Sequence, residues 1–152
     1  MSRTLVLGAL LTAGAAAAVL SAPTAAAWPA DDARLAACDF AREVGTYDHA
    51  ALDGYFERVL ARSTGAFAEE LAGAAPELRQ AMQQAQVRAW VEWAECGSVR
   101  GDLLRQTVLI TMTQVRANAN SPEPQPQHIS MTATVDNVLG RWLVSELESP
   151  LP

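Results

Sequence analysis

Residues 104–115, LRQTVLITMTQV, carry the clearest secondary-structure signal of this 152-residue chain. Apolar and polar side chains alternate there with a period of two, which sends neighbouring side chains to opposite faces of a β-strand. Val108, Ile110 and Met112 share one face, and the threonines of the stretch lie partly on the other. We therefore predict a strand with an apolar face that belongs to the core.

Three further stretches alternate in the same way and are predicted to be strands: residues 87–95, 128–135 and 141–148. Turns are expected at 97–102 and 137–140, and an extended, proline-containing polar loop at 118–127. Strands that follow one another through such connections pair as an antiparallel meander. The second half of the chain therefore predicts an antiparallel sheet of about four strands.

The residues before these strands follow helical spacing instead. Asp31 or Asp32 is a suitable N-cap for a first helix that reaches about Val44, and Gly45 is placed to end it. One face of this helix is apolar and is predicted to lie inward: Ala33, Ala37, Phe40, Ala41 and Val44.

Further helical segments are predicted before the first strand. Asp48 is expected to cap a second helix, and residues 63–64 begin a third. Pro76 is expected to start a fourth, turn-rich segment with Leu78 and Met82 facing inward. Helices followed by an antiparallel meander are typical of an α+β fold, and we find neither an internal repeat nor a second domain.

The N-terminal residues have the pattern of an export segment. Arg3 gives a short positive region, and no charge follows from Leu5 to Ala30. Ala25 and Ala27 form the small-residue pattern that signal peptidase accepts, while the length of the uncharged stretch leaves an uncleaved anchor open. We expect three parts: a signal peptide or N-terminal membrane anchor at 1–27, a linker at 28–31, and a single domain at 32–152.

The charge balance excludes some classes of partner. The chain has 17 acidic and 11 basic residues, a net charge of −6, and so lacks the basic surface that binding to nucleic acid requires. Anionic lipid headgroups are disfavoured for the same reason, so we expect membrane contact only through residues 5–27, if they are retained. The predicted location is the cell envelope or the secreted fraction, or the membrane if the leader remains.

Cys38 and Cys96 are the two cysteines of the chain. In an exported protein an even number of cysteines favours a disulfide, and two buried free thiols are the alternative. Residues 35–38 also have the letters of a lipoprotein signal. The charged residues at 31–34 separate them from the apolar run, which disfavours lipidation.

No pattern in the sequence predicts catalysis, a metal site or a cofactor. His49 and His128 have no further ligand at metal-binding spacing. Tyr47 and Asp48 could suggest an acid–base pair, but adjacent side chains point in different directions and Asp48 is better explained as a helix cap. We find neither a glycine-rich phosphate loop nor a nucleophile elbow, and therefore predict a non-enzymatic protein.

Two tryptophans mark a candidate interface. Trp90 and Trp93 lie on the strand predicted at 87–95, an odd number of residues apart, so we expect them on opposite faces of the sheet. The outward one could anchor a protein partner, and the alternative is an aromatic side chain that fills a curved sheet.

Particular residues resemble the Mce-associated protein family of actinobacteria. The matching positions are Phe40-Ala41-Arg42, Thr46-Tyr47-Asp48, Leu52, Leu60, Ser63-Thr64-Gly65-Ala66-Phe67 and the ending from Gly140 to Leu147, GRWLVSEL. The resemblance covers residue 32 to the C-terminus, mostly as a pattern. Members of this family have a longer and more hydrophobic N-terminal anchor than this chain.

The resemblance implies a cone-shaped domain like nuclear transport factor, in which a strongly curved sheet wraps the first helix. That arrangement would bring Cys38 close to Cys96. The implied role is accessory: such proteins support Mce complexes, which move lipids across the envelope, and the domain would act by binding partner proteins.

The same fold leaves two other functions open. A cavity inside the cone could bind a small apolar molecule such as a lipid, and its expected lining is Phe40, Tyr55, Met112 and Met131. An isomerase-like enzyme would need a buried carboxylate in that cavity, and the strand pattern offers none.

Overall fold

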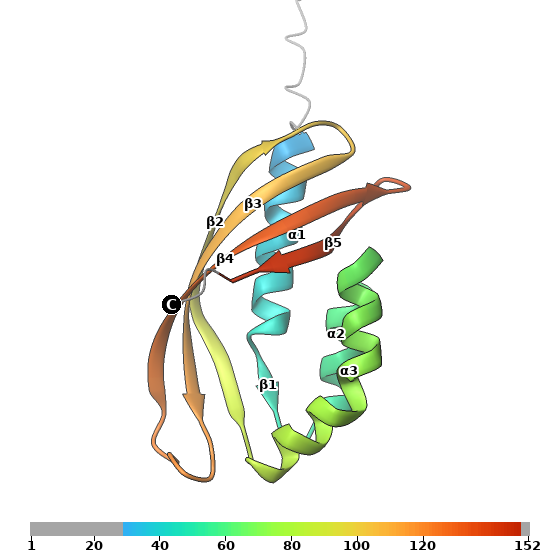
Figure 1. Ribbon diagram of the computed structural model, residues 1–152. Helices are drawn as coiled ribbons and strands as arrows, with labels where there is room; N and C mark the ends of the chain where they lie inside the picture. The colour runs from blue at the N-terminus through green and yellow to red at the C-terminus, as the bar shows by residue number, and fades with distance from the viewer. Residues whose placement is uncertain (1–28, 150–152) are drawn as a thin grey trace, which may run out of the picture.

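The computed structural model describes residues 29–149, so the expected leader at 1–27 lies outside the described residues. The elements are α1 (Pro29–Val44), β1 (Tyr47–Asp48), α2 (Leu52–Ala61), α3 (Gly65–Gln84), β2 (Arg88–Gly101), β3 (Arg105–Ala117), β4 (Gln125–Val138) and β5 (Arg141–Glu148). Helices precede a strongly curved antiparallel sheet, which confirms the predicted α+β cone (Figure 1). Between residues 29 and 149, no helix is long and apolar enough to cross a membrane.

The sheet is a meander in which every strand pairs antiparallel with its neighbours along the chain, in the order β1-β2-β3-β4-β5. The stretch at 104–115 is its centre, because β3 pairs with β2 on one side and β4 on the other. Val108, Ile110 and Met112 are almost fully buried, as their alternation predicts. The sheet curls around α1 and faces α2 and α3 with its concave side (Figure 1).

Helix α1 begins earlier than expected. Pro29 is its first residue, where the missing proline N–H costs no hydrogen bond, so residues 29–31 belong to a helix and not to a linker. Ala33, Ala37, Phe40 and Ala41 of its apolar face are fully buried as predicted, and Val44 is partly buried against the core. Gly45 follows its end, and a Cβ there would lie 2.5 Å from Val91 Cγ2 and 2.9 Å from the Ala41 carbonyl oxygen. Glycine is needed at this position because the chain passes so close to the sheet.

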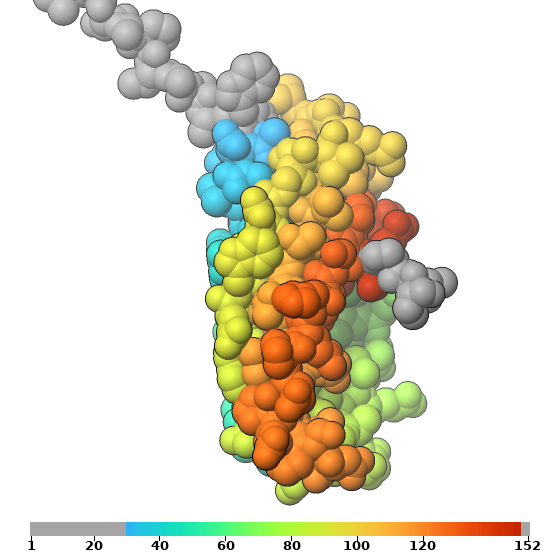
Figure 2. Space-filling view, turned by 90° about the vertical axis from the view of Figure 1, so that its left-hand side faces the viewer, coloured from blue at the N-terminus to red at the C-terminus, as the bar shows by residue number. Residues whose placement is uncertain are grey.

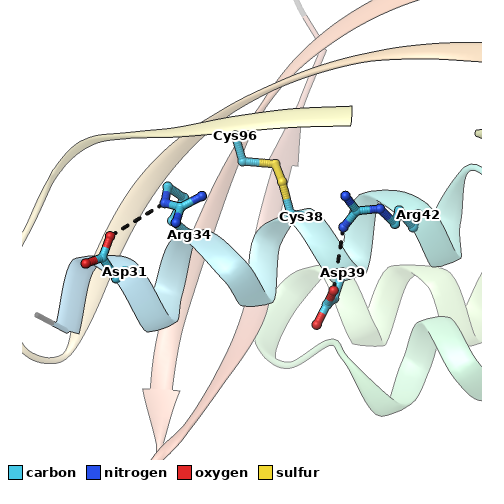
Figure 3. The surroundings of a disulfide bond; sticks show 6 residues. All are labelled: Asp31, Arg34, Cys38, Asp39, Arg42 and Cys96. Atoms are coloured by element: carbon cyan, nitrogen blue, oxygen red, sulfur yellow. Dashed lines mark ion pairs between the residues drawn. A yellow bond between two sulfur atoms is a disulfide. The ribbon is translucent and has the colours of Figure 1, made fainter. Parts of the chain in front are cut away.

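The disulfide between Cys38 and Cys96 is present and joins α1 to β2. The two Cα atoms lie 5.8 Å apart although 58 positions separate them in the sequence. Figure 3 shows the bond crossing from the helix to the strand, with the exposed ion pairs Asp31–Arg34 and Asp39–Arg42 along the same helix. The bridge therefore fastens α1 to the sheet edge.

The region around Pro76 differs from the prediction. A single helix, α3, runs through Pro76 without a new segment starting there. Proline removes one N–H from the helix ladder, but the residues on both sides are good helix formers and the helix continues. Met82 is partly buried against the core, as expected, whereas Leu78 is 40% exposed and was wrongly expected inside.

Asp48 also has a different role from the one predicted. It belongs to the short strand β1, which the sequence analysis missed, and α2 begins only after Ala51. The Asp48 carboxylate accepts a hydrogen bond from the Ala50 N–H at 2.8 Å, which forms a turn and not a helix cap. β1 pairs Tyr47 with Ala89 and thereby adds a fifth, two-residue strand to the predicted sheet.

Candidate protein-interaction site

Trp90 and Trp93 lie on the same face of the sheet, contrary to the prediction. Trp90 is opposite Val115 and Trp93 is opposite Thr113, so both pair with β3 residues of the same parity. The register shifts by one residue at Glu92, between Val91 and Trp93. Such a bulge inserts one extra residue and reverses the alternation that follows it.

The shared face is the convex, outer one. On β3 the opposite parity carries the core residues Val108, Ile110 and Met112, whereas Trp90 is 42% exposed and Trp93 is 52% exposed. Figure 2 looks onto this face, with β2, β3 and β4 across it. Small hydroxyl side chains occupy much of the rest of the face: Thr111, Thr113, Ser130 and Thr132. Two exposed indoles among threonines and one serine form an amphipathic surface suited to binding a protein.

A pocket of about 490 Å³ adjoins Trp90 at the end of the sheet where β1 pairs with β2. Its lining is partly apolar and partly charged: Thr46, Tyr47, Asp48, Ala51, Arg58, Arg88, Ala89, Trp90, Ala117 and Pro124. Arg58 already donates to Glu43 at 2.9 Å, whereas Arg88 forms no ion pair with any residue of the described part. A free guanidinium beside an exposed tryptophan combines two of the residue types that are enriched at binding hot spots.

Arg88 was missed by the sequence analysis. Nothing in its local sequence marks it, because the pocket forms only when β1 pairs with β2 and brings residues 46–48 beside residues 88–90. The pairing depends on contacts between segments about forty residues apart, which no local pattern predicts. We define the tryptophan surface as Trp90, Trp93 and Arg88.

The residues expected to line a ligand cavity lie in the hydrophobic core. Phe40, Tyr55, Met112 and Met131 are between 0 and 7% exposed and belong to one packed cluster. Phe40 fills the concave side from α1, with its ring 5.4 Å from that of Phe67 in an edge-to-face contact. Their role in ligand binding stays a prediction, and what the structure shows for them is core packing.

The buried polar side chains offer little chemistry. Within residues 29–149 they are two serines and two glutamines: Ser63, Gln106, Gln114 and Ser145. The described residues contain no group of three or more His, Cys, Asp or Glu that could hold a metal ion. An isomerase-like reaction requires a general base in the cavity, and none of these four side chains is one.

Among residues 29–149, Tyr55 is a buried ionisable side chain whose pKa is strongly shifted. Burial, and secondarily Tyr47, raise its pKa from 10.0 to about 12, against the opposing effect of Arg58. Its hydroxyl donates to the Val44 carbonyl oxygen at 3.2 Å. Because the phenol stays neutral at physiological pH, it acts as a structural donor that ties α2 to the end of α1.

We expect the free energy of unfolding of Tyr55→Phe to fall less at alkaline pH than that of the wild type. Between pH 10, the ordinary pKa of tyrosine, and about pH 12, the unfolded chain releases the Tyr55 proton while the folded chain keeps it, so rising pH favours unfolding. Two pKa units correspond to about 2.7 kcal/mol by pH 12. Urea unfolding of the wild type and the variant from pH 9 to 12 measures the difference, with Tyr47 present in both. Parallel pH profiles would contradict the assignment.

The chain has no match among protein-family models, and none among curated proteins. Its fold does match solved structures. An IcmL-like type IV secretion system protein from Legionella pneumophila aligns with a TM-score of 0.55 at 15% identity, over 77% of this chain and 88% of that one. The periplasmic domain of DotI aligns with 0.53 at 14%, over 78% and 93%.

VirB8 from Agrobacterium tumefaciens aligns with a TM-score of 0.51 at 14% identity, over 78% of this chain and 91% of that one. These similarities show a shared cone fold, like that of nuclear transport factor. At such identities they do not carry over individual residues, and the tryptophan surface rests on its own geometry.

Proposed function

We propose that this protein is a non-enzymatic assembly component of the cell envelope, which binds a protein partner through the tryptophan surface. The observation that carries the proposal is the bulge at Glu92, which places Trp90 and Trp93 together on the exposed convex face. Apolar side chains that gather on an exposed face and are rimmed by polar residues mark protein-interaction sites. The solved structures that share this fold include an IcmL-like protein of a type IV secretion system and a domain described as periplasmic, which supports a role in an envelope complex.

The finer proposal is that the complex is of the Mce type. It is supported by the residue resemblance at 40–42, 46–48 and 140–147 and by the export pattern of residues 1–27. The disulfide between Cys38 and Cys96 is consistent with an oxidising compartment outside the cytoplasm. The partner would then be a protein subunit of a lipid-transport complex.

We expect the double variant Trp90→Ala, Trp93→Ala to lose its partner while keeping its fold. Truncating a hot-spot tryptophan costs about 2 kcal/mol or more, so each change should weaken binding by roughly thirtyfold. The measurement is co-purification of the tagged full-length chain from the membranes of its native host in mild detergent. Wild type and variant are compared by quantitative mass spectrometry.

Leu78→Ala provides the matched control, because Leu78 is an exposed apolar side chain on α3, away from the tryptophan surface. It should retain the same envelope proteins as the wild type. A wild-type protein that brings down no envelope protein would refute the assembly role. Discrete partners without any Mce component would refute only the finer proposal.

A further inference from the structure

The loops at the other end of the sheet expose a second apolar cluster. We call this cluster the apolar tip, and its members come from the β2–β3 and β4–β5 hairpins: Val99, Leu103, Leu104, Val138 and Leu139. Leu103 is 67% exposed, Leu104 is 70% exposed and Leu139 is fully exposed. Single exposed apolar residues are ordinary, whereas several gathered at one end of a domain indicate a binding surface.

Backbone and ionic contacts hold the two hairpins side by side. The Asn137 N–H donates to the Leu104 carbonyl oxygen at 2.8 Å. The Arg105 guanidinium binds the Asp136 carboxylate with two hydrogen bonds of 2.6 and 2.9 Å. The leucines of both turns therefore form one surface and not two separate loops.

The polar groups of the turns are satisfied within the turns. The Asp102 carboxylate accepts from the N–H groups of Leu104 and Arg105 at 2.8 and 3.0 Å, and these bonds lower its pKa. In the other turn, the Asn137 side chain accepts from the Gly140 N–H at 2.8 Å. These polar groups of the turns are thus hydrogen-bonded within the hairpins, whereas the leucine side chains are exposed to solvent.

Leu139 is poorly explained by folding alone. It has a φ of 52° and precedes Gly140, whose φ is 86°. Asparagine, aspartate or glycine is strongly preferred at the first of two such positions in a tight hairpin turn. A bulky apolar residue in this left-handed conformation, with no contact that buries it, costs stability and has no benefit within the domain. A contact outside the domain would explain why leucine stands at this position.

The location of the tip indicates what covers it. Figure 1 shows the β2–β3 hairpin beside the start of α1, and the Ser98 hydroxyl donates to the Ala30 carbonyl oxygen at 3.1 Å. Ala30 lines the same pocket as Val99 and Leu103. The sequence that leads into α1 is uncharged from Leu5 to Ala30, long enough to cross a bilayer. The tip therefore lies at the end of the domain that follows this segment.

The charges around the tip do not oppose a lipid surface. The chain as a whole has a net charge of −6. At this end of the domain, five acidic side chains are nearly balanced by four arginines: Asp31, Asp32, Asp102, Asp136 and Glu146 against Arg34, Arg100, Arg105 and Arg141. Most of the acidic excess thus lies elsewhere on the domain, so an anionic bilayer repels this end less than it would repel the rest.

We propose that the apolar tip inserts into the interface of a lipid bilayer, with the leucines of both hairpins in the boundary between headgroups and acyl chains. Such shallow insertion of apolar side chains is how peripheral surfaces bind membranes. It extends the membrane contact of this protein beyond residues 5–27, and it orients the tryptophan surface sideways, along the membrane plane. The proposal does not depend on the identity of any protein partner.

The test places an environment-sensitive fluorophore at Leu139→Cys in the full-length chain. Both native cysteines are bonded to each other, so the introduced thiol can be labelled without reduction. The probe is vesicles of phosphatidylcholine with phosphatidylglycerol, into which the protein is reconstituted. We expect a blue shift of the emission and quenching by lipids with a nitroxide on the acyl chain. A label at Glu123→Cys, in the exposed β3–β4 loop, should show neither.

A charge variant tests whether the leucines are responsible. Leu103→Glu with Leu104→Glu, in the background labelled at position 139, should abolish the blue shift, because carboxylates oppose insertion. An unchanged shift in that variant would overturn the proposal. So would a label at Leu139→Cys that stays in water, equal shifts at both labelled positions, or a shift without vesicles that grows with protein concentration. The last result would mean that a second copy covers the tip.

Discussion

Replacing both cysteines, as Cys38→Ser with Cys96→Ser, is expected to lower the free energy of unfolding by about 4 kcal/mol. The bridge closes a loop across 58 positions, and cross-linking a loop of that length removes much of the conformational entropy of the unfolded chain. Both residues are buried, at 6 and 7% exposed, so two hydroxyls would also replace sulfur in the core. A loss of this size is a large part of the total stability of an ordinary domain.

The measurement is urea unfolding of the wild type and the double variant, monitored by tryptophan fluorescence. Wild type with a strong reductant is the matched control, since it removes the bond without adding a hydroxyl. A reductant effect below about 1 kcal/mol would mean that the bridge adds little to the packing of α1 against β2. The bridge is also close to the tryptophan surface along β2, so partner binding should be measured on the reduced protein as well.

The sequence could predict those features that depend on local alternation and composition. The period of two at 104–115 correctly located β3 and its buried face, and helical spacing located the buried face of α1. The pairing of Cys38 with Cys96 followed from the resemblance to a cone fold, and it is present. Each of these features rests on a pattern that is complete within one segment, or on a known arrangement of the whole domain.

The features that the sequence could not predict depend on pairing between segments. Strict alternation put Trp90 and Trp93 on opposite faces, and a bulge at Glu92 reversed that result. Whether a strand bulges is decided by its fit to the neighbouring strand and to the curvature of the sheet. The sequence around Glu92 therefore contains no local signal that predicts the bulge. β4 likewise begins at Gln125 and pairs Pro126 with Val115, inside the stretch expected to be a loop.

The candidate site was therefore only half predicted. The tryptophans could be singled out from the sequence because a large indole side chain usually belongs either to the core or to an interface. Arg88 and the pocket beside Trp90 arise from the contact of β1 with β2, and β1 has only two residues. A strand that short gives no periodic signal, so the residues that it brings together could not be grouped in advance.

Phe40→Ala is expected to lower the free energy of unfolding by about 3–5 kcal/mol. Phe40 is fully buried where α1 fills the concave side of the sheet, and its ring contacts Phe67. Removing the ring loses its burial and its aromatic contact and leaves a cavity among side chains that relax only partly. Leu35→Ala, at a position of the same helix that is 53% exposed, should cost much less.

This comparison also decides between core packing and a ligand cavity on the inner face. If Phe40 lined an open space for a lipid, its truncation would enlarge that space and cost little stability, because no packed contacts would be lost. Urea unfolding of Phe40→Ala and Leu35→Ala separates the two cases. A loss of several kcal/mol for Phe40→Ala alone means that the cone is filled by its own first helix, and that its binding functions lie on its outer surfaces. Equal, small losses for both variants would instead favour an exported lipid-binding domain and remove the main support for a solid core.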